Sequence, residues 1–453
     1  MQRALKKVLQ KITPSQKEVK ESGEMFLKIQ QFIKDEFGLP AELMGSIAKN
    51  TFIAGDKDMD TFVLFPTSTP RKVLEEKGIE IGKAVFKKFN KGVFQISYAE
   101  HPYTKGVIGK FHIEIVPAYL VGDAGRIQSA VDRTPFHTAY VKKNLKKNAE
   151  VLLLKKFLKG IGCYGSDLKK EGFSGYLCEL LIIKYGCFEK TLQASQNLHW
   201  QEIIDLENHH SKKDTHKIKK MFSGQPLIFI DPVDKNRNVA AVLSPEKIAR
   251  FIFHARTFLD KPKESYFFPR QKKANKKQAL EFYKKTNTMI VALAFENPGL
   301  IEDIIYPQLR RLAGTLTMHA KHAGFKVFDS WVFADAECGI ALEVRDEIIP
   351  RQFVIEGPSV FNSPLHQERF VKAHKMVWFR GEKYYAVSAR AETDICKLIS
   401  KILHSTKKNM HNTGIPDNFI MPLRKNARIL SGKKITKIKS AEFWRGAEKD
   451  KVK

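Results

Sequence analysis

Two aspartates near residue 60 carry the strongest chemical signal in the sequence. Asp58 and Asp60 stand two residues apart at the start of the apolar run TFVLF, and Gly45-Ser46 precedes them by about a dozen positions. Because strand side chains alternate between faces, both carboxylates should project from one face of a strand. Two carboxylates on one face repel each other unless a cation lies between them, and Mg²⁺ prefers such hard oxygen ligands. The pair therefore indicates a magnesium site, although a solvated turn that happens to hold two acids would show the same spacing.

A third carboxylate can join this pair from a second predicted strand. In the stretch FHIEIVP (111–117), alternation places Glu114 on one face and Ile113 and Ile115 on the other. Between the two strands, residues 71–89 carry apolar side chains at the spacing of an amphipathic helix. Strand, helix and strand would thus bring three acids to one sheet edge. In two-metal phosphoryl transfer, one ion activates the attacking hydroxyl and the other, roughly 3.5–4 Å away, holds the leaving pyrophosphate, so three acids suffice to bind both ions.

The balance of charge points to a polyphosphate partner. The 453 residues include 78 Lys and Arg against 49 Asp and Glu, which gives a formal net charge of +29. This excess is far larger than solubility requires and favours nucleic acid, although a lysine-rich composition can also be a habit of the source organism. A membrane surface is the other anionic candidate, but no apolar run approaches the roughly 18 residues of a spanning helix. We therefore expect no membrane partner.

The five cysteines favour a reducing compartment. They stand at positions 163, 178, 187, 338 and 396, without the CxxC spacing of a structural zinc site. No signal-peptide pattern precedes the first predicted helix. Together these observations predict a cytoplasmic protein without structural zinc.

The length and the changes of pattern along the chain predict three domains. In the first, 1–137, the first forty residues would form one amphipathic helix up to Gly38, and a mixed αβ segment would follow. The second, 138–270, would be helical, and the lysine-rich stretch 261–278 would be an exposed connector. The helices expected in the second domain cover 138–159, 174–188 and 191–209.

The third predicted domain, 271–453, has a different order of elements. Four strands are expected, in the segments MIVALAFE, KVFDSWVFA, CGIALEVRD and YYAVSAR. A long helix (302–323) would follow the first strand, a second helix (366–374) the third, and a last helix (392–404) the fourth. This βαββαβ order predicts a ferredoxin-like sandwich at about 288–404. The last thirty residues are strongly basic.

Several further blocks follow the acids in a fixed order. They are YAEHPY (98–103), VDRTPFH (131–137), LLK (153–155) with Gly165-Ser166 beyond it, GFSGYLCELL (172–181), DPVD (231–234) and RNVAA (237–241). No single block is specific. Together with the glycine-serine turn and the paired aspartates, however, the ordered set resembles the archaeal-type, class I CCA-adding enzymes over nearly the whole chain. These are tRNA nucleotidyltransferases of the DNA polymerase β-like nucleotidyltransferase superfamily.

The resemblance implies an α+β, multidomain fold with a polymerase β-like nucleotidyltransferase palm, a helical central domain and a C-terminal ferredoxin-like (RRM-like) region. It implies template-independent addition of C, C and A to the 3′ end of tRNA from CTP and ATP, with release of pyrophosphate. Asp58, Asp60 and Glu114 would be the catalytic acids and would hold two Mg²⁺ ions. The basic surface would grip the acceptor and T arms of the tRNA. A homodimer is one option, because the sequence does not fix the oligomeric state.

The same resemblance assigns contacts to the triphosphate. Ser46 would contact the β and γ phosphates, and Lys155 and Tyr164 would also contact the triphosphate. Without the resemblance, Lys155 in its lysine-rich helix would be a surface residue and Tyr164 a core aromatic. Lys49 stands where family members usually have arginine, which replaces a bidentate clamp by a point charge. Glu114 likewise stands where aspartate is commoner.

Three further residues would lie near the incoming nucleotide. Thr134 and His137, three apart at a helix start, share a face, although His137 could simply cap the helix terminus. Arg237 would help to recognise the incoming base and the phosphates of the RNA end, since its five-donor fork suits the edges of both C and A. The alternative for Arg237 is a salt bridge to Asp231 or Asp234.

Two other functions remain open at this point. A poly(A) polymerase-like RNA adenylyltransferase would share the catalytic acids but add long tails. A non-catalytic tRNA-binding relic belongs to a different class of protein. Intact acids at all three positions argue against the relic.

Overall fold

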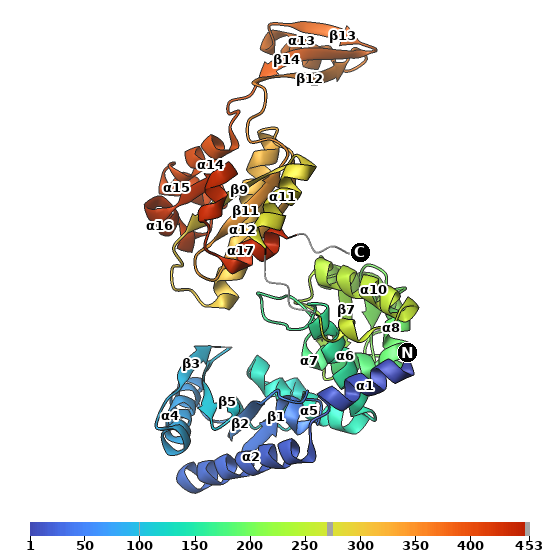
Figure 1. Ribbon diagram of the computed structural model, residues 1–453, viewed down its shortest axis with the longest axis vertical. Helices are drawn as coiled ribbons and strands as arrows, with labels where there is room; N and C mark the ends of the chain where they lie inside the picture. Colours follow the sequence, from blue (N-terminus) through green and yellow to red (C-terminus); the bar gives the residue numbers. More distant parts are fainter. Residues whose placement is uncertain (99, 270–274, 449–453) are drawn as a thin grey trace. The chain divides into compact units, whose positions relative to one another are not determined.

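The computed structural model describes residues 1–98, 100–269 and 275–448 (Figure 1). The chain divides into two compact units, Met1–Arg270 and Gln271–Lys453, here called the N-terminal and C-terminal units. The predicted domain boundary between 270 and 271, part of the predicted connector and Ala99 of the YAEHPY block lie outside the described residues. The predicted boundary after residue 137 stays a prediction.

A five-stranded sheet forms the framework of the first part of the N-terminal unit. Its strands are β1 (Ala41–Met44), β2 (Asp58–Phe65), β3 (Gln95–Tyr98), β4 (Pro102–Ile108) and β5 (Phe111–Tyr119), in the order β1-β2-β5-β4-β3. Strands β2 and β5 are parallel, and the other neighbours are antiparallel. Helix α4 (Arg71–Asn90) lies between β2 and β3 in the chain. The two predicted acid-bearing strands and the predicted helix between them are therefore confirmed.

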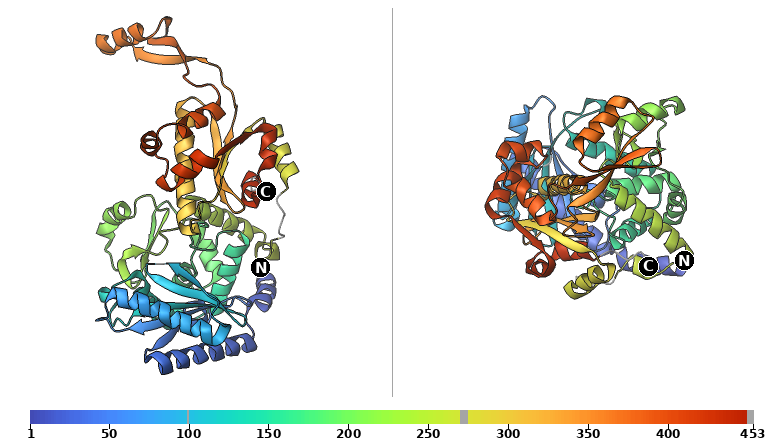
Figure 2. Two further views of the ribbon diagram at one scale, coloured as in Figure 1. Left: turned by 90° about the vertical axis from the view of Figure 1, so that its left-hand side faces the viewer. Right: turned by 90° about the horizontal axis from the view of Figure 1, so that it is seen from above.

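Two helices cover one face of this sheet (Figure 2). They are α2 (Gln16–Phe37) and α4, and they pack against Met59, Val63 and Ile113 of the central strands. Because these apolar residues alternate with the acids along β2 and β5, the acids point to the opposite face. The sheet thus buries one face against helices and leaves the other for the site.

The first forty residues contain two helices, so the prediction of a single one was wrong. Helix α1 (Gln2–Ile12) ends at Thr13, whose backbone is extended ahead of Pro14. Ser15 then begins α2 with a capping box that involves Glu18, and α2 ends at Gly38 in the left-handed conformation (φ +67°). The separate α1 packs against a helix of the following part of the chain rather than on the sheet.

The second part of the N-terminal unit combines helices with a small sheet. The helices are α5 (Arg133–Asn144), α6 (Asn148–Gly160), α7 (Gly175–Tyr185), α8 (Phe188–Ser195), α9 (Thr215–Met221) and α10 (Pro245–Asp260). The strands β6 (Glu202–Ile204), β7 (Leu227–Asp231) and β8 (Asp234–Asn238) form a sheet in that order. Their common core contains a cluster of aromatic rings around Phe157 on α6.

Two of the helix predictions for this part need correction. The expected helix over 138–159 is split into α5 and α6, because Leu145 is extended (ψ 118°). The expected helix over 191–209 ends at Ser195, and the chain turns at Gln201, which is in the left-handed conformation (φ +56°), to enter β6. Helical spacing of apolar residues over a short stretch does not distinguish a helix from a loop that packs on the same core.

The C-terminal unit contains a four-stranded antiparallel sheet in the order β10-β11-β9-β15. The strands are β9 (Met289–Phe295), β10 (Val327–Ala334), β11 (Cys338–Val344) and β15 (Arg428–Ser431), and α12 (Glu302–His322) joins β9 to β10. Numbered along the chain, this order is 2-3-1-4, which is the ferredoxin-like arrangement. The predicted fold class is confirmed.

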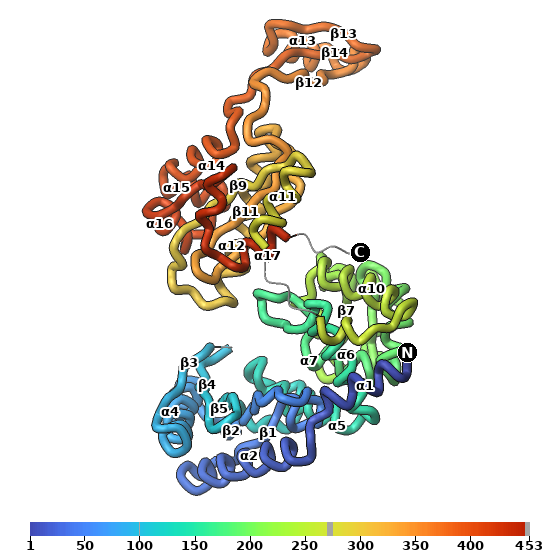
Figure 3. Tube along the Cα trace, viewed as in Figure 1, coloured from blue at the N-terminus to red at the C-terminus, as the bar shows by residue number. Residues whose placement is uncertain are grey.

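The assignment of the fourth strand of that sheet was wrong. The YYAVSAR segment lies in β14 (Lys383–Ala389), which pairs with β12 (Gln352–Ser359) and β13 (Val377–Arg380) in a separate sheet that also carries α13 (Pro364–Ala373). This small sheet is inserted between β11 and α14 (Ile395–Leu403), and the chain reaches β15 only afterwards (Figure 3). The remaining helices are α11 (Lys276–Thr286), α15 (Lys407–Asn412), α16 (Asp417–Asn426) and α17 (Ala441–Ala447). In the described residues, no helix combines the length and apolar character needed to cross a membrane.

Candidate active site

The three predicted acids meet on neighbouring strands. Strands β2 and β5 pair in parallel with Asp60 directly opposite Glu114, and Asp58 lies two residues earlier on the same face of β2. On the other side of β5, Lys105 of β4 pairs with Glu114. The strand geometry predicted from alternation is therefore present, with a lysine beside the third acid.

Burial and the charges of their neighbours shift the pKa values of two of these acids. Burial and the neighbouring Asp58 charge raise the pKa of the Asp60 carboxyl. Burial and the Asp60 charge raise the pKa of Glu114 to about 7, although Lys105 opposes the shift. A cation among the three carboxylates would relieve both the repulsion and the cost of burial.

The position of the Asp60 side chain leaves no room for a side chain at residue 45. The residue is left-handed (φ +67°), and a Cβ atom built on it would lie 1.8 Å from Oδ2 of Asp60. Met44 pairs with Asp60 across β1 and β2, and the short helix α3 (Gly45–Ala48) starts directly afterwards. The glycine-serine turn is thus packed against the acids, which places Ser46 beside them.

A cavity of about 930 Å³ contains most of the predicted site. Its lining includes all three acids and four of the seven predicted nucleotide-binding residues, Ser46, Lys49, Lys155 and Tyr164. Lys155 is buried, so its alternative as a surface lysine is wrong. Thr134, His137 and Arg237 do not line this cavity.

The buried carboxylate of Glu179 also lines the cavity, and it was not singled out from the sequence. Glu179 on α7 accepts a hydrogen bond from Lys49 Nζ at 2.6 Å and another from the Thr51 hydroxyl at 2.5 Å. Lys155 Nζ lies 3.6 Å from Oε1 of the same carboxylate, whereas Lys49 contacts Oε2. Lys155 Nζ also donates a hydrogen bond to the Thr51 carbonyl oxygen at 2.9 Å. Burial lowers the pKa of Lys155, and the Glu179 charge opposes that shift. Both lysines are therefore held at fixed positions beside the acids.

A second buried carboxylate, Asp231, contacts two of the remaining predicted residues, His137 and Arg237. Its Oδ2 atom lies 2.8 Å from His137 Nε2 and 2.7 Å from Arg237 Nη1, and its Oδ1 atom accepts a hydrogen bond from the Tyr176 hydroxyl at 3.2 Å. Tyr176 also stacks on His137, with the ring centroids 4.1 Å apart, and lines the large cavity. Burial lowers the pKa of His137, and the Asp231 carboxylate opposes that shift.

Arg237 makes the salt bridge that was its alternative role, and it still presents free donors. Its side chain is 37% exposed, and it lines a separate cavity of about 540 Å³ together with Ser166 and Ser174. Only one of its nitrogens is used by Asp231. Thr134 lies in the first turn of α5, one turn before His137.

The sequence contains a signal for Glu179, the buried carboxylate that was not predicted. Glu179 interrupts the otherwise apolar run YLCELLII of α7, and a charge at a buried helix position requires a partner. What the sequence could not supply is the identity of the partners, because Lys49 and Thr51 are about 130 positions away.

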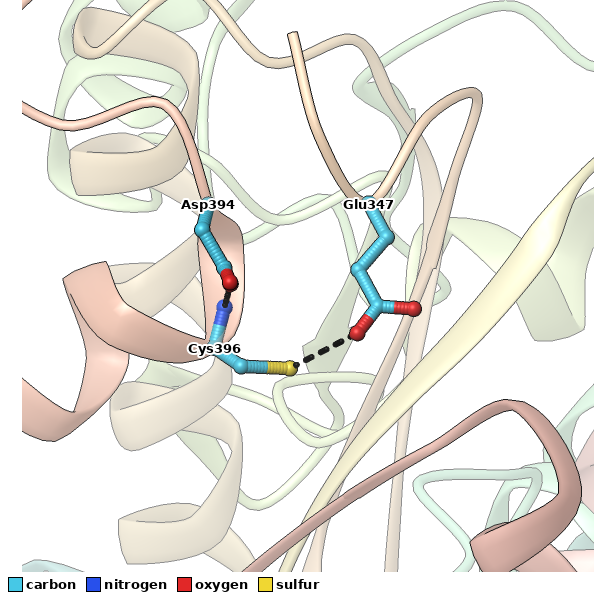
Figure 4. A group of neighbouring side chains, drawn as sticks. All are labelled: Glu347, Asp394 and Cys396. Carbon is cyan, nitrogen blue, oxygen red and sulfur yellow. Dashed lines mark hydrogen bonds between the residues drawn. The ribbon is translucent and has the colours of Figure 1, made fainter.

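One compact group of metal-type ligands lies in the C-terminal unit. Among the described residues, the ligand atoms of Glu347, Asp394 and Cys396 all lie within 4.8 Å of one another (Figure 4). Asp58, Asp60 and Glu114, which the structure also describes, do not form a group by this criterion. Asp394 caps α14 by accepting from the Cys396 and Lys397 backbone N–H groups, and the Cys396 thiol donates to Glu347 at 3.4 Å. Burial raises the pKa of Cys396 to about 11. The group is therefore explained as a helix cap with a protonated thiol.

Comparison with known proteins shows the family to which the chain belongs. The chain matches family models described as a nucleotidyltransferase domain (27–137), a tRNA nucleotidyltransferase, second domain (149–268), and a CCA-adding enzyme, C-terminal domain (286–417). The CCA-adding enzyme of Pyrococcus abyssi is 41% identical over 389 residues, which cover 84% of this chain and 85% of the relative. The chain belongs to the CCA-adding enzyme family. The CCA-adding enzymes of Thermococcus gammatolerans and Methanocaldococcus jannaschii are each 37% identical to this chain. The match covers 91% of this chain and of the first relative, and 94% of this chain and of the second.

Membership of the CCA-adding enzyme family confirms the resemblance and the enzyme class predicted from the motifs. It does not test the individual site residues. Their roles rest on the geometry described above and are tested by the following substitutions.

Gly45→Ala should abolish most of the activity while the protein stays folded. The new Cβ would displace Asp60, and misplacing a catalytic group by about 1 Å can cost about 100-fold in rate. The measurement is kcat for CMP incorporation, with circular dichroism to monitor folding. Gly109→Ala is the matched control, because Gly109 is also left-handed (φ +61°) but has open space at its Cβ position. Equal activity of the two variants would contradict the packing argument.

Glu179→Gln should destabilise the N-terminal unit by about 3–5 kcal/mol, because it leaves Lys49 and Lys155 buried without a counter-charge. The change is measured as the free energy of unfolding in urea. Glu42→Gln, an exposed carboxylate on β1, should change stability by less than about 0.5 kcal/mol. An unfolding free energy for Glu179→Gln equal to that of the wild type would show that the buried ion cluster contributes nothing.

Proposed function

We propose that the protein adds C, C and A to the 3′ end of tRNA, using CTP and ATP and releasing pyrophosphate. The observation that carries the proposal is the register of β2 and β5, which sets three carboxylates opposite a wall of fixed lysines in one cavity. Membership of the CCA-adding enzyme family supplies the product.

The cationic and the acidic residues of the cavity have different roles in this proposal. The anionic triphosphate is attracted to Ser46, Lys49, Lys155 and the Tyr164 hydroxyl, which line the cavity beside the acids. Lys49 takes the place of the family's usual arginine as a single point charge, and its bond to Glu179 keeps it oriented. The 3′ hydroxyl of the RNA is then placed toward Asp58, Asp60 and Glu114, one of which can accept its proton.

The three acids fit divalent cations of the Mg²⁺ type. Their oxygens are the hard ligands that Mg²⁺ prefers, and the raised pKa values of Asp60 and Glu114 reflect a repulsion that cations would remove. Asp58, Asp60 and Glu114 would hold two Mg²⁺ ions, which supply activation of the hydroxyl and stabilisation of the leaving pyrophosphate when bound.

The incoming base would be recognised by the Asp231 group. Arg237 keeps free donors that suit the edges of C and A, and its anchor on Asp231 fixes the direction of the guanidinium. His137 and Tyr176 pack beside it and connect it to the large cavity, and Thr134 lies one turn from His137.

The C-terminal unit would bind the acceptor and T arms of the tRNA. Its strongly basic last residues and its ferredoxin-like sheet suit phosphate contacts far along the chain from the acids. A cytoplasmic location and a homodimer belong to the same proposal as expectations.

One experiment tests this function against its two alternatives. The protein is incubated with tRNA that lacks CCA, with CTP, ATP and Mg²⁺, and the product ends are sequenced, with the Asp60→Ala variant as the control for chemistry. Ends extended by CCA, and unchanged ends with Asp60→Ala, support the proposal. Runs of A would establish a poly(A) polymerase-like activity. Unchanged ends with the wild type would establish a non-catalytic relic.

Arg237→Ala should lower kcat/KM for both CTP and ATP and should weaken discrimination against UTP and GTP. A bidentate base contact is worth about 1–3 kcal/mol, so the loss should be about 5-fold to 150-fold. Arg237→Lys should recover little, because it keeps the charge but loses the fork.

The control for Arg237 is Lys235→Ala, the removal of an exposed charge two residues away on β8. The choice among the four nucleotides separates base recognition from a purely structural salt bridge to Asp231. If discrimination is unchanged in a well-folded Arg237→Ala protein, Arg237 serves only as that salt bridge.

A further inference from the structure

Another polar cavity of the N-terminal unit lies outside the active site, and residues between positions 199 and 219 line it. It has a volume of about 490 Å³, and its lining includes His199, Trp200, Asp205, His210, Lys212 and Lys219. None of these residues lines the cavity that holds the acids. The function proposed above does not use them.

Trp200 is exposed at this cavity in a way that the fold does not explain. The side chain is 57% exposed. Within the described part of the chain, its ring stacks on no other ring and its indole N–H has no hydrogen-bond partner. An apolar ring that keeps more than half of its surface in water contributes less to folding than a buried one.

The backbone that carries Trp200 is nevertheless fixed. The next residue, Gln201, is left-handed (φ +56°), which is unfavourable for a residue other than glycine. Its side-chain amide donates to the carbonyl oxygens of Lys219 and Phe222, both at 3.1 Å, and its backbone N–H donates to Pro226 at 2.9 Å. These bonds hold the Trp200 loop against the end of α9, so the ring is presented outward from a rigid support.

The segment that follows Trp200 in the cavity wall is strongly cationic, while the acids Glu202 and Asp205 line the same cavity. The segment 211–220 (SKKDTHKIKK) carries five exposed lysines, Lys212, Lys213, Lys217, Lys219 and Lys220. Its only acid, Asp214, is engaged by Ser211. Among the residues that the structure describes, none of the five lysines forms a salt bridge. The positive charge is therefore available to an external anion.

We propose that this surface, Trp200 with the lysines of 212–220, is a binding site for an unpaired RNA nucleotide. The base stacks on the Trp200 ring, and the flanking phosphates contact Lys212 and Lys219, which line the same cavity. An exposed aromatic ring beside unpaired cations is the combination that binds single-stranded nucleic acid, since every base has a face that stacks and every linkage carries a charge. Duplex RNA would satisfy the lysines but would offer no free base face to the ring.

The inference rests on the proposed function only in taking tRNA as the natural source of the nucleotide. A free nucleotide has the same chemistry, so the test compares the two sources. The probes are a single-stranded oligo(A) RNA, AMP, and a duplex RNA of the same length, each titrated against the full-length protein at several salt concentrations.

Trp200→Ala should weaken binding of oligo(A) by about tenfold, and Trp200→Phe should bind nearly as well as the wild type, because a phenyl ring still stacks. Binding of the duplex should be the same in all three proteins. The KM for tRNA should rise in Trp200→Ala, whereas kcat at saturating tRNA should stay at the wild-type value. If Trp200→Ala merely unfolded the protein, it would also lose binding of the duplex. Recovery of oligo(A) binding in Trp200→Phe therefore identifies stacking on the ring as the cause.

The double variant Lys212→Gln, Lys219→Gln should flatten the salt dependence of oligo(A) binding, lowering the slope of log K against log salt by roughly 1.4 for two phosphates. Its matched control is Lys72→Gln, Lys77→Gln, which removes two exposed lysines from α4.

Three results would overturn the proposal: oligo(A) affinity unchanged in Trp200→Ala, equal affinity for oligo(A) and duplex, or AMP bound as tightly as the oligonucleotide, which would assign the site to free nucleotides. Failure of CCA addition would refute the proposed function but would leave these binding results unaffected.

Discussion

Repulsion among three carboxylates is the constraint on which the active-site region depends. The parallel pairing of β2 with β5 sets Asp60 beside Glu114, and alternation adds Asp58 on the same face. Left to themselves, these groups would separate or take up protons, and the raised pKa of Glu114 reflects that tendency. Several neighbours keep the acids in place: the helices that pack on the other face of the sheet, Lys105 across from Glu114, and a glycine where any side chain would collide with Asp60.

Positive charge near the acids is also held by burial rather than left on flexible side chains. Glu179 fixes Lys49 and Lys155 on one carboxylate, and Asp231 does the same for His137 and Arg237. Lys49 and Lys155 reach Glu179 from other elements of the chain, and His137 lies 94 positions from Asp231, whereas Arg237 is only six positions from that acid. A buried ion pair adds little net stability, but it restricts its members to one geometry. That restriction is what a site requires when it must hold a triphosphate and a base in fixed positions.

The same chain uses aromatic residues in two opposite ways. Around Phe157, rings from α6, α8 and α10 pack against one another and form the core that supports the cavity wall. Trp200 lies in the loop after α8, beside the left-handed Gln201, and is exposed to solvent. The sequence pattern placed Trp200 in a helix over 191–209, and periodicity alone gave no reason to expect otherwise. The turn depends on hydrogen bonds from Gln201 to residues that are about twenty positions away.

The amino-acid sequence determined the features that depend on local chemistry. The acid-bearing strands, α4 and the helix start before His137 follow from alternation and helical spacing. The family resemblance carried by the ordered motifs singled out Ser46, Lys49, Lys155 and Tyr164, and all four line the cavity that holds the acids. Only the tertiary structure decided which distant segments pair. It assigned the fourth strand of the ferredoxin-like sheet to β15 instead of β14, and it joined Lys49 to Glu179. For Arg237 it selected Asp231 from the two neighbouring acids that the sequence offered. The physical reason is that a strand's hydrogen bonds and a buried charge can be satisfied by any complementary segment, so the choice is made by the packing of the whole core and leaves no mark in the neighbouring residues.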